Sequence, residues 1–344
     1  MAWHAAAKPL CWDRAALRST GGRPPSNTPT AAVAPIYGSH DAVGGEASLR
    51  NIHSECAAHR PTGALGAVLS AGREGSAMTT PGGWLDAVRR ERPLVMNITN
   101  FVAMNFAANV LLAVGASPVM SHAREEVADM AAQAQALVLN IGTLEPVWVD
   151  AMHMAARTAA ERRIPVVLDP VGVGATPFRT RVAADLLATA TITAVRGNAG
   201  ELTALAGAQG TMHGVDAADA PPVADLTSWV RAHDVLAIAT GAVDQAADGT
   251  NSREVANGHP LMARVTATGC SLSALVGAFL AVAPPADRLD ASVAALVVFG
   301  VAGETAARRA SGPGTFVPLL LDALAALEPD QVDAAARITR SRPA

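Results

Sequence analysis

Residues 165–174 read PVVLDPVGVG, an apolar run that ends at Asp169 and is followed by a proline and two glycines. Three further segments have the same form, namely ALVLNIGT at 136–143, ITAVRGNAGE at 192–201 and VLAIATG at 235–241. Short apolar runs of this kind are typical of strands that are buried on both faces. Alanine-rich stretches long enough for helices separate them, at 147–161, 180–189, 199–206 and 222–233. The alternation predicts an α/β fold with a mostly parallel central sheet and helices on both faces.

The first 77 residues differ from the rest of the chain. They are rich in Gly, Pro, Ser and Ala, and they show no sustained hydrophobic period. We interpret residues 1–77 as a disordered N-terminal extension. The segment MTTPGGWLDAVRRERPLV, which begins at Met78, is typical of an ordinary protein start, so a mis-assigned translation start is the alternative to a genuine tail. Residues 78–344 are expected to form a single domain, strongly helical after Arg264.

The composition excludes several classes of protein. A net charge of −4, a pI near 6.1 and 3% aromatic residues argue against a nucleic-acid-binding surface. Lys8 is the only lysine in the chain, so a Walker A loop, a protein-kinase strand lysine and a pyridoxal Schiff base have no candidate outside the first residues. The three cysteines are too few for a disulfide framework, which fits a reducing cytoplasm. No apolar run reaches roughly 18 residues, so we expect a soluble, cytoplasmic protein that binds no membrane.

Polar residues follow each of the four apolar runs, where an open α/β sheet binds its ligands. They are Asn140, Asp169, Thr240 and the group Arg196, Asn198 and Glu201, each accompanied by glycine. Any one of these loops could be a turn and nothing more. Four of them at one edge of a sheet predict a binding site instead. Its carboxylates are candidate metal ligands, and its arginine is a candidate partner for an anion.

The segment TATGCS at 266–271 leads directly into the apolar helix predicted at 270–283. Small residues at the start of a helix leave backbone N–H groups free for an anion, and the helix dipole adds positive potential. The dipole contributes roughly 0.3–2 kcal/mol, whereas each tenfold in rate requires about 1.4 kcal/mol, so phosphoryl transfer would also need a metal and an arginine. Cys270 lies where a helix N-terminus lowers the pKa of a thiol, which suits a base or nucleophile; the alternative is a small buried apolar residue.

Several segments resemble, in the same order along the chain, those of the hydroxyethylthiazole kinase family. They include ITN at 98–100, LLAVGASPVM at 111–120, LNIGTL at 139–144, DPVGVGATPF at 169–178, RGNA at 196–199, TGC at 268–270 and GPG at 312–314. The resemblance extends from about Arg89 to about Leu327. It implies a ribokinase-like fold and a homotrimer with active sites at the subunit interfaces. It also implies ATP- and Mg²⁺-dependent phosphorylation of the hydroxyl of 4-methyl-5-(2-hydroxyethyl)thiazole, a salvage step toward thiamine.

The resemblance further implies a role for each matching residue. Cys270 stands where related kinases of the fold have an aspartate base, and is the candidate catalytic residue. The remaining roles are substrate binding by Met120, Ala267 and Asn100, ATP binding by Arg196, Thr240 and Asn198, an anion hole at Thr268 and Gly269, and metal binding by Glu201 and Asp169.

Three positions depart from the family pattern. Met96 replaces the usual histidine, Ala107 a common threonine, and Ala267 the glycine that normally opens the anion-hole loop. If residue 267 requires a positive φ, alanine is strained there by roughly 1 kcal/mol or more. These departures leave two alternatives open. One is a ribokinase-like kinase of another small alcohol, such as a pyrimidine, and the other is a catalytically weak sensor that binds thiazole or nucleotide.

Overall fold

The computed structural model describes residues 80–207 and 227–341, and the expected extension at 1–77 lies outside these ranges. Within them one nine-stranded sheet has the order β2-β1-β3-β4-β5-β6-β7-β8-β9. The parallel strands are β1 (Leu94–Ile98), β2 (Ser117–Met120), β3 (Ala136–Asn140), β4 (Val166–Asp169), β5 (Ala194–Asn198) and β6 (Leu236–Thr240). The antiparallel strands are β7 (Asp244–Ala247), β8 (Ser252–Val255) and β9 (Ile338–Ser341).

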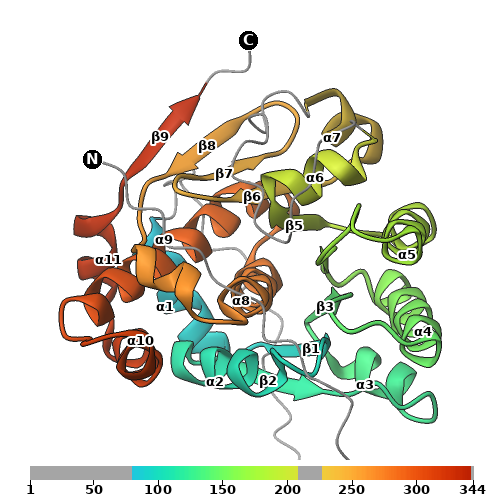
Figure 1. Cartoon of the computed structure of the whole chain (residues 1–344), viewed down its shortest axis with the longest axis horizontal. Coiled ribbons are helices and arrows are strands. Elements are labelled where there is room, and N and C mark those ends of the chain that lie inside the picture. The colour runs from blue at the N-terminus through green and yellow to red at the C-terminus, as the bar shows by residue number, and fades with distance from the viewer. Residues whose placement is uncertain (1–79, 208–226, 342–344) are drawn as a thin grey trace, which may run out of the picture. The chain divides into compact units, whose positions relative to one another are not determined.

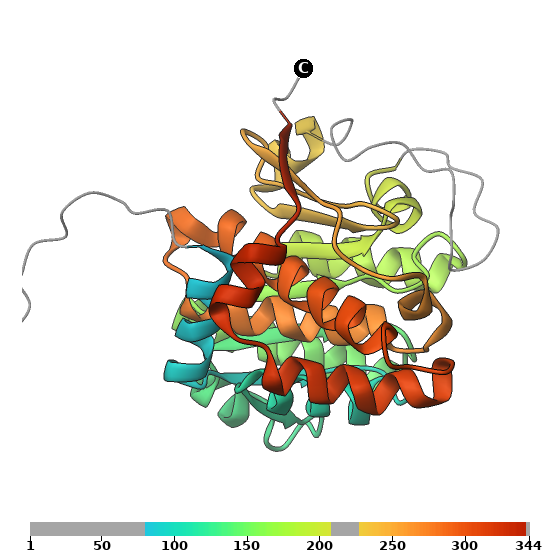
Figure 2. The same ribbon diagram turned by 90° about the vertical axis from the view of Figure 1, so that its left-hand side faces the viewer.

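Helices cover both faces of the sheet, as expected (Figure 1). One face carries α1 (Pro81–Glu91), α2 (Met104–Val114), α8 (Thr268–Val282), α9 (Arg288–Ala307), α10 (Pro313–Ala326) and α11 (Pro329–Ala335). The other carries α3 (Val127–Gln133), α4 (Pro146–Arg162), α5 (Pro177–Thr189), α6 (Ala199–Leu205) and α7 (Thr227–His233). Figure 2 shows the C-terminal helices of the first group in front of the sheet.

The four apolar runs form β3 to β6, so the predicted parallel core is confirmed. The structure adds strands that the hydrophobic pattern did not predict, in particular the antiparallel extension. DQAA in β7, SREV in β8 and ITRS in β9 contain few apolar residues, because these strands lie toward the edge of the sheet. Their pairing depends on neighbouring strands more than on local hydrophobicity.

Helix α8 is packed so closely against the sheet that its position is fixed. All residues from Ser271 to Leu280 are buried. A Cβ atom added at Gly277 would lie 2.9 Å from a methyl carbon of Val138 on β3, so this helix approaches the strand more closely than a side chain allows. The N-terminus of α8 is thereby held at the carboxyl ends of the parallel strands.

The segment 285–307, which contains α9, is long and apolar enough to span a membrane, unlike the shorter runs counted in the sequence. Its 18-residue apolar window is 83% buried inside the domain. This burial is that of a core helix, because the residues from Ala291 to Gly303 pack into the centre of the helical layer.

Candidate active site

Asp169, at the end of β4, is the most buried carboxylate of the site and is fully shielded from solvent. Its Oδ2 accepts hydrogen bonds from Asn140 Nδ2 at 2.7 Å and from Ser273 Oγ at 2.7 Å. Arg196 Nη1 lies 3.9 Å from the same oxygen. Oδ1 has no hydrogen-bond partner among the described residues. Burial raises the pKa of Asp169, and Arg196 and the two hydrogen bonds oppose this only in part. The carboxylate therefore has an unused oxygen for a cation.

Asn100 connects Asp169 to the thiol of Cys270. Its Nδ2 donates to Asn140 Oδ1 at 2.8 Å and to Cys270 Sγ at 3.3 Å. Asn140 in turn donates to Asp169, so an unbroken chain of hydrogen bonds crosses the ends of β1, β3 and β4. The candidate base and the candidate metal ligand thus belong to one network, whose members are held in place by one another.

The pKa of Cys270 is opposite to the sequence-based expectation. Burial of the thiol, together with the negative charge of Asp169, raises the pKa of Cys270 to about 11. The expected lowering by the helix N-terminus is wrong, because desolvation outweighs the dipole at this position. At pH 7 about one thiol in ten thousand is a thiolate when the pKa is near 11. Cys270 is therefore a thiol, rather than a standing thiolate, in the free protein.

Arg196 lies against the N-terminus of α8. Its Nη2 donates to Thr240 Oγ1 at 2.5 Å, and a Cβ atom added at Gly269 would lie 2.7 Å from Nη1. Arg196 is 8% exposed, and its Nε has no partner among the described residues. A cation beside a helix N-terminus is electrostatically unfavourable, because both carry positive potential. Their adjacency therefore makes this position a candidate site for a polyanion.

The backbone at the start of α8 supplies further donors. Ser271 N–H bonds to Ala267 O at 2.9 Å, and no side chain caps this helix. The N–H groups of Thr268, Gly269 and Cys270 precede that bond, at positions where a helix has no internal acceptor. Ala267, the N-cap, has φ 67° and ψ 0°. Its backbone is left-handed, so the strained alternative of the sequence analysis is the one that the structure adopts.

Glu201 joins the start of α6 to the end of β5 and to the loop after β4. Its two carboxylate oxygens accept the N–H groups of Gly172 at 2.7 Å and Asn198 at 2.9 Å, and Asn198 Oδ1 accepts Glu201 N–H at 2.8 Å. The last two bonds form a capping box. Burial raises the pKa of Glu201, and the charge of Asp169 adds to this effect. A cation shared by these two carboxylates would relieve both penalties.

The carboxylates fit Mg²⁺ better than a metal that requires an all-protein shell. In the described part of the chain no group of three His, Cys, Asp or Glu side chains could hold a metal ion. Mg²⁺ usually keeps several waters and is bound by one or two carboxylates together with substrate phosphates. Asp169, through its unpartnered Oδ1, is the side chain best suited to contact such an ion directly.

The structure brings most of the predicted site residues together. Met120 ends β2 as the register partner of Asn97 on β1, at the same edge of the parallel sheet, and packs partly against the core. The sequence analysis placed Asn140 at the predicted binding edge without a role of its own, and it did not include Ser273. Asn140 had a signal, because it ends an apolar run. No local sequence pattern marks Ser273, since its hydrogen-bond partner Asp169 lies 104 positions away in the chain.

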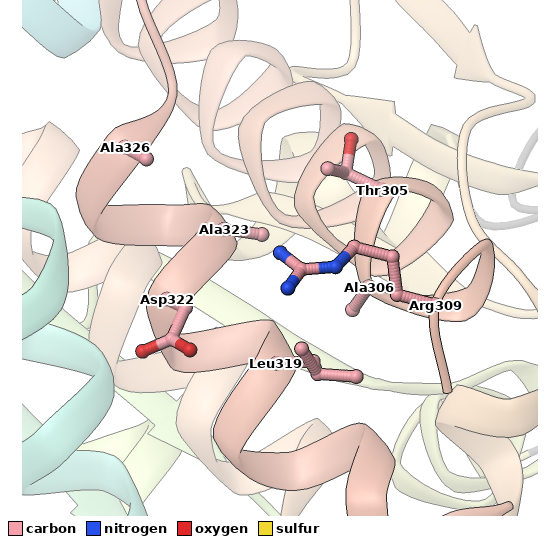
Figure 3. A pocket seen from close by; sticks show the side chains of 7 residues that line it. All are labelled: Thr305, Ala306, Arg309, Leu319, Asp322, Ala323 and Ala326. Atoms are coloured by element: carbon pink, nitrogen blue, oxygen red, sulfur yellow. The ribbon is translucent and has the colours of Figure 1, made fainter. Parts of the chain in front are cut away.

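A separate hollow lies between α9 and α10. It has a volume of about 170 Å³ and is lined by Thr305, Ala306, Arg309, Leu319, Asp322, Ala323 and Ala326. Figure 3 shows the Arg309 side chain extending across it, with Asp322 on the opposite helix. Pockets for drug-sized ligands usually reach 300 Å³ or more, and no predicted site residue lines this one. It is not the candidate active site.

The sequence is similar to known kinases over nearly all of the described chain. The profile of the hydroxyethylthiazole kinase family matches residues 85–330. A hydroxyethylthiazole kinase of Cereibacter sphaeroides is 53% identical over 259 residues, which is 75% of this chain and 97% of that protein. One of Desulfotalea psychrophila is 49% identical over 260 residues, which is 75% and 94% of the two chains.

Solved structures agree in fold. The hydroxyethylthiazole kinase protein of Pyrococcus horikoshii OT3 superposes with a TM-score of 0.68 at 41% identity, covering 76% of this chain and 99% of that one. A ribokinase-like superfamily protein of Enterococcus faecalis V583 has a TM-score of 0.50 at 13% identity, covering 70% and 93%. The described domain therefore has the ribokinase-like fold, with a candidate polyanion site at its strand ends. The chain belongs to the hydroxyethylthiazole kinase family.

Proposed function

We propose that this chain transfers the γ-phosphoryl group of ATP to the hydroxyl of 4-methyl-5-(2-hydroxyethyl)thiazole. The product would be the thiazole phosphate used to make thiamine. The names of the relatives support the acceptor, and the contact between Arg196 and the N-terminus of α8 supports the reaction. That contact is the observation that carries the proposal, because a guanidinium beside free helix amides suits the charge of a transferring phosphoryl group.

The phosphate end of the site uses two kinds of donor, a guanidinium and backbone amides. Arg196 and the amides of Thr268, Gly269 and Cys270 bind the phosphoryl oxygens and stabilise the charge that develops on them. Thr240 accepts a hydrogen bond from Arg196 and so orients the guanidinium. These groups are preorganised, since α8 is locked against the sheet and Arg196 is almost fully buried. Preorganised donors contribute most to this class of reaction.

The acceptor end is formed by Asn100 and Cys270. We assign Asn100, Met120 and Ala267 to the substrate, with Cys270 next to its hydroxyl. Since the pKa of Cys270 is near 11, the thiol would act as a hydrogen-bonding partner for the hydroxyl before transfer. A loose phosphoryl-transfer transition state places little demand on a base, because bond formation to the acceptor is late. Positioning by Asn100 then matters more than the basicity of the thiol.

Asp169 and Glu201 would hold Mg²⁺, and Asn198 would help to arrange the ATP phosphates. When bound, the metal supplies charge neutralisation between neighbouring phosphate groups. Burial is the main cause of the raised pKa values of Asp169 and Glu201, so a bound cation would favour the ionised form of both carboxylates. Asn198 holds Glu201 in place through the capping box.

Three further properties belong to the same proposal. We assign the catalytic domain to residues 78–344 and expect residues 1–77 to be dispensable. We expect a homotrimer, which light scattering on purified protein would detect. We place the enzyme in the cytoplasm, where ATP and Mg²⁺ are available.

The test is ADP release by the purified full-length chain with ATP, Mg²⁺ and hydroxyethylthiazole. Reactions with a pyrimidine alcohol and without an acceptor run in parallel. Thiazole-dependent turnover that is lost without Mg²⁺ supports the proposal. Turnover only with the pyrimidine would favour a kinase of another alcohol, and binding of thiazole without turnover would favour a sensor.

A matched pair of variants tests the role of Arg196. We expect Arg196→Ala to lower kcat/KM for ATP by about 100-fold or more, as removal of one donor to a transition-state oxyanion typically does. Arg181→Ala removes an exposed arginine of α5 and is the control. Equal activity of the two variants would contradict the assignment of Arg196.

A further inference from the structure

Arg179, in the first turn of α5, makes an unusual set of contacts. Its Nη1 donates to Ile141 O at 2.8 Å and to Val171 O at 2.6 Å, and its Nη2 donates to Gly142 O at 2.7 Å. No carboxylate among the described residues forms an ion pair with it. One guanidinium therefore bonds to three backbone carbonyls. These are charge-assisted hydrogen bonds, which are stronger than bonds between neutral groups.

The position of this arginine does not favour its own helix. Positive side chains in the first turn oppose the helix dipole, and acidic residues are preferred there. The N-cap of α5 is already supplied by Thr176, whose Oγ1 accepts the N–H of Arg179 at 3.3 Å. The side chain thus contributes little to the stability of α5 itself. Its contacts lie with the loop that follows β3 and with the loop that connects β4 to α5.

The first of these loops follows β3 and supports the acceptor end of the site. Gly142 N–H donates to Asn140 Oδ1 at 2.9 Å. A Cβ atom added at Gly142 would lie 2.6 Å from Asn100 Nδ2, so the loop backbone presses directly on the Asn100 side chain. Asn100 is the residue that donates to Cys270. A shift of this loop would therefore move the amide that orients the thiol.

The second loop follows β4 and supports the carboxylates. Val171 follows Asp169 and Pro170 in the chain, and Gly172 N–H donates to Glu201 Oε1 at 2.7 Å. Gly172 adopts φ 71°, and an added Cβ atom would lie 3.4 Å from Arg179 Cδ. The arginine stem thus packs against the same residue whose amide holds Glu201. The Arg179 side chain therefore supports both the loop that positions Asn100 and the loop that positions Glu201.

We propose that Arg179 is a positioning residue for phosphoryl transfer, because it ties the loops after β3 and β4 together and so sets Asn100 against Cys270 and Glu201 against the Gly172 amide. The effect on catalysis rests on the proposed function, whereas the effect on the network does not. Loss of the guanidinium frees three carbonyls at once and lets the two loops move independently. Displacements of about 1 Å at reacting groups cost on the order of 100-fold in rate.

The first experiment measures steady-state kinetics of Arg179→Ala, Arg179→Lys and the control Arg181→Ala. We expect kcat of Arg179→Ala to fall by about 10–100-fold while KM for ATP and thiazole changes less than about threefold. Lysine should restore little, since its ammonium group does not reproduce the planar fork of the guanidinium. Guanidinium chloride at tens of millimolar should restore part of the activity of Arg179→Ala, and potassium chloride at equal ionic strength should not. An unchanged kcat in Arg179→Ala would overturn the proposal.

The second experiment needs no kinase activity. Alkylation of Cys270 by iodoacetamide is followed by mass spectrometry of the peptide that contains residue 270, which separates it from Cys11 and Cys56. We expect the rate to rise about three- to tenfold in Arg179→Ala and to stay at the wild-type value in Arg181→Ala, because the thiol loses its buried contact with Asn100. An unchanged rate overturns the proposal, and Arg179→Lys serves if the alanine variant melts below the assay temperature.

The two experiments fail in different ways. A wild-type protein with no thiazole-dependent turnover would contradict the proposed function, while faster alkylation in Arg179→Ala would still support the tie between the loops. Active wild-type protein with unaltered alkylation and kinetics in the variant would leave the function standing and remove Arg179 from it.

Discussion

Replacing Ala267 by glycine should make the folded domain more stable, although it removes a methyl group. Ala267 has φ 67° and ψ 0°, where a Cβ atom meets the following carbonyl oxygen. This conformation costs an alanine roughly 1–2 kcal/mol and costs glycine almost nothing. Against this gain, glycine loses about 0.4–1 kcal/mol more backbone entropy on folding. The difference leaves a net stabilisation of about 0.5–1 kcal/mol.

Thermal unfolding, followed by circular dichroism at 222 nm, measures this effect. A change of 1 kcal/mol shifts Tm by about 2–4 °C in a domain of 150–250 residues, so the expected rise is about 1–4 °C. Ala184→Gly is the matched control, because Ala184 is an exposed residue inside α5. There glycine should lower stability by about 0.5–1 kcal/mol. The two substitutions are chemically identical and should have opposite signs.

A fall in Tm for Ala267→Gly, as large as that of Ala184→Gly, would refute the reasoning. It would mean that residue 267 is not left-handed in solution, or that its methyl group makes contacts worth more than the strain. Activity gives a second readout, since the N–H groups that follow residue 267 form the anion site. We expect kcat of Ala267→Gly within about threefold of wild type, because those amides keep their positions.

Three further predictions concern the charges around the site. Gly269→Ala should raise KM for ATP about tenfold or more, because its Cβ would lie 2.7 Å from Arg196 Nη1 and displace it; unchanged kinetics would argue against this contact. Burial raises the pKa of Asp244 to about 6, so ionisation of this carboxyl destabilises the fold as pH rises from about 4 through 6. Asp244→Asn should therefore raise the free energy of unfolding by about 1–3 kcal/mol at pH 7 and hardly change it at pH 4, as measured by denaturant titration. With a pKa near 11, Cys270 should alkylate about tenfold faster for each pH unit between 7 and 10, and a plateau near pH 8 would restore it as a thiolate base.

The sequence allowed the central sheet and most of the site to be predicted, because both follow from local patterns of apolar and polar residues. The apolar runs that became β3 to β6 carry their polar residues at the ends, and parallel strands bring such ends together. Asp169, Arg196 and Thr240 could therefore be assigned to one edge before any contact was known. The start of α8 could also be predicted, because small residues there are followed by an uninterrupted apolar segment.

Properties that depend on distant residues could not be predicted in this way. The pKa of Cys270 illustrates this, because the helix dipole is a local feature whereas desolvation depends on the packing of the whole fold around the thiol. Ser273 is bonded to a carboxylate 104 residues away, and nothing near it in the chain marks that partner. Strand β9 pairs with β8 through backbone bonds between mostly polar residues, so the hydrophobic pattern contains no trace of it.

The polar residues at the strand ends also bear on how the chain avoids misfolding. Asn140 and Asp169 face each other as register partners on β3 and β4, and Asn198 and Thr240 do so on β5 and β6. A shift of one residue between neighbouring strands would separate these pairs and turn buried side chains to the opposite face. Each polar group left without a partner would cost about 1–3 kcal/mol. These residues of the candidate active site therefore also align the strands. A substitution among them can lower the yield of folded protein as well as its activity.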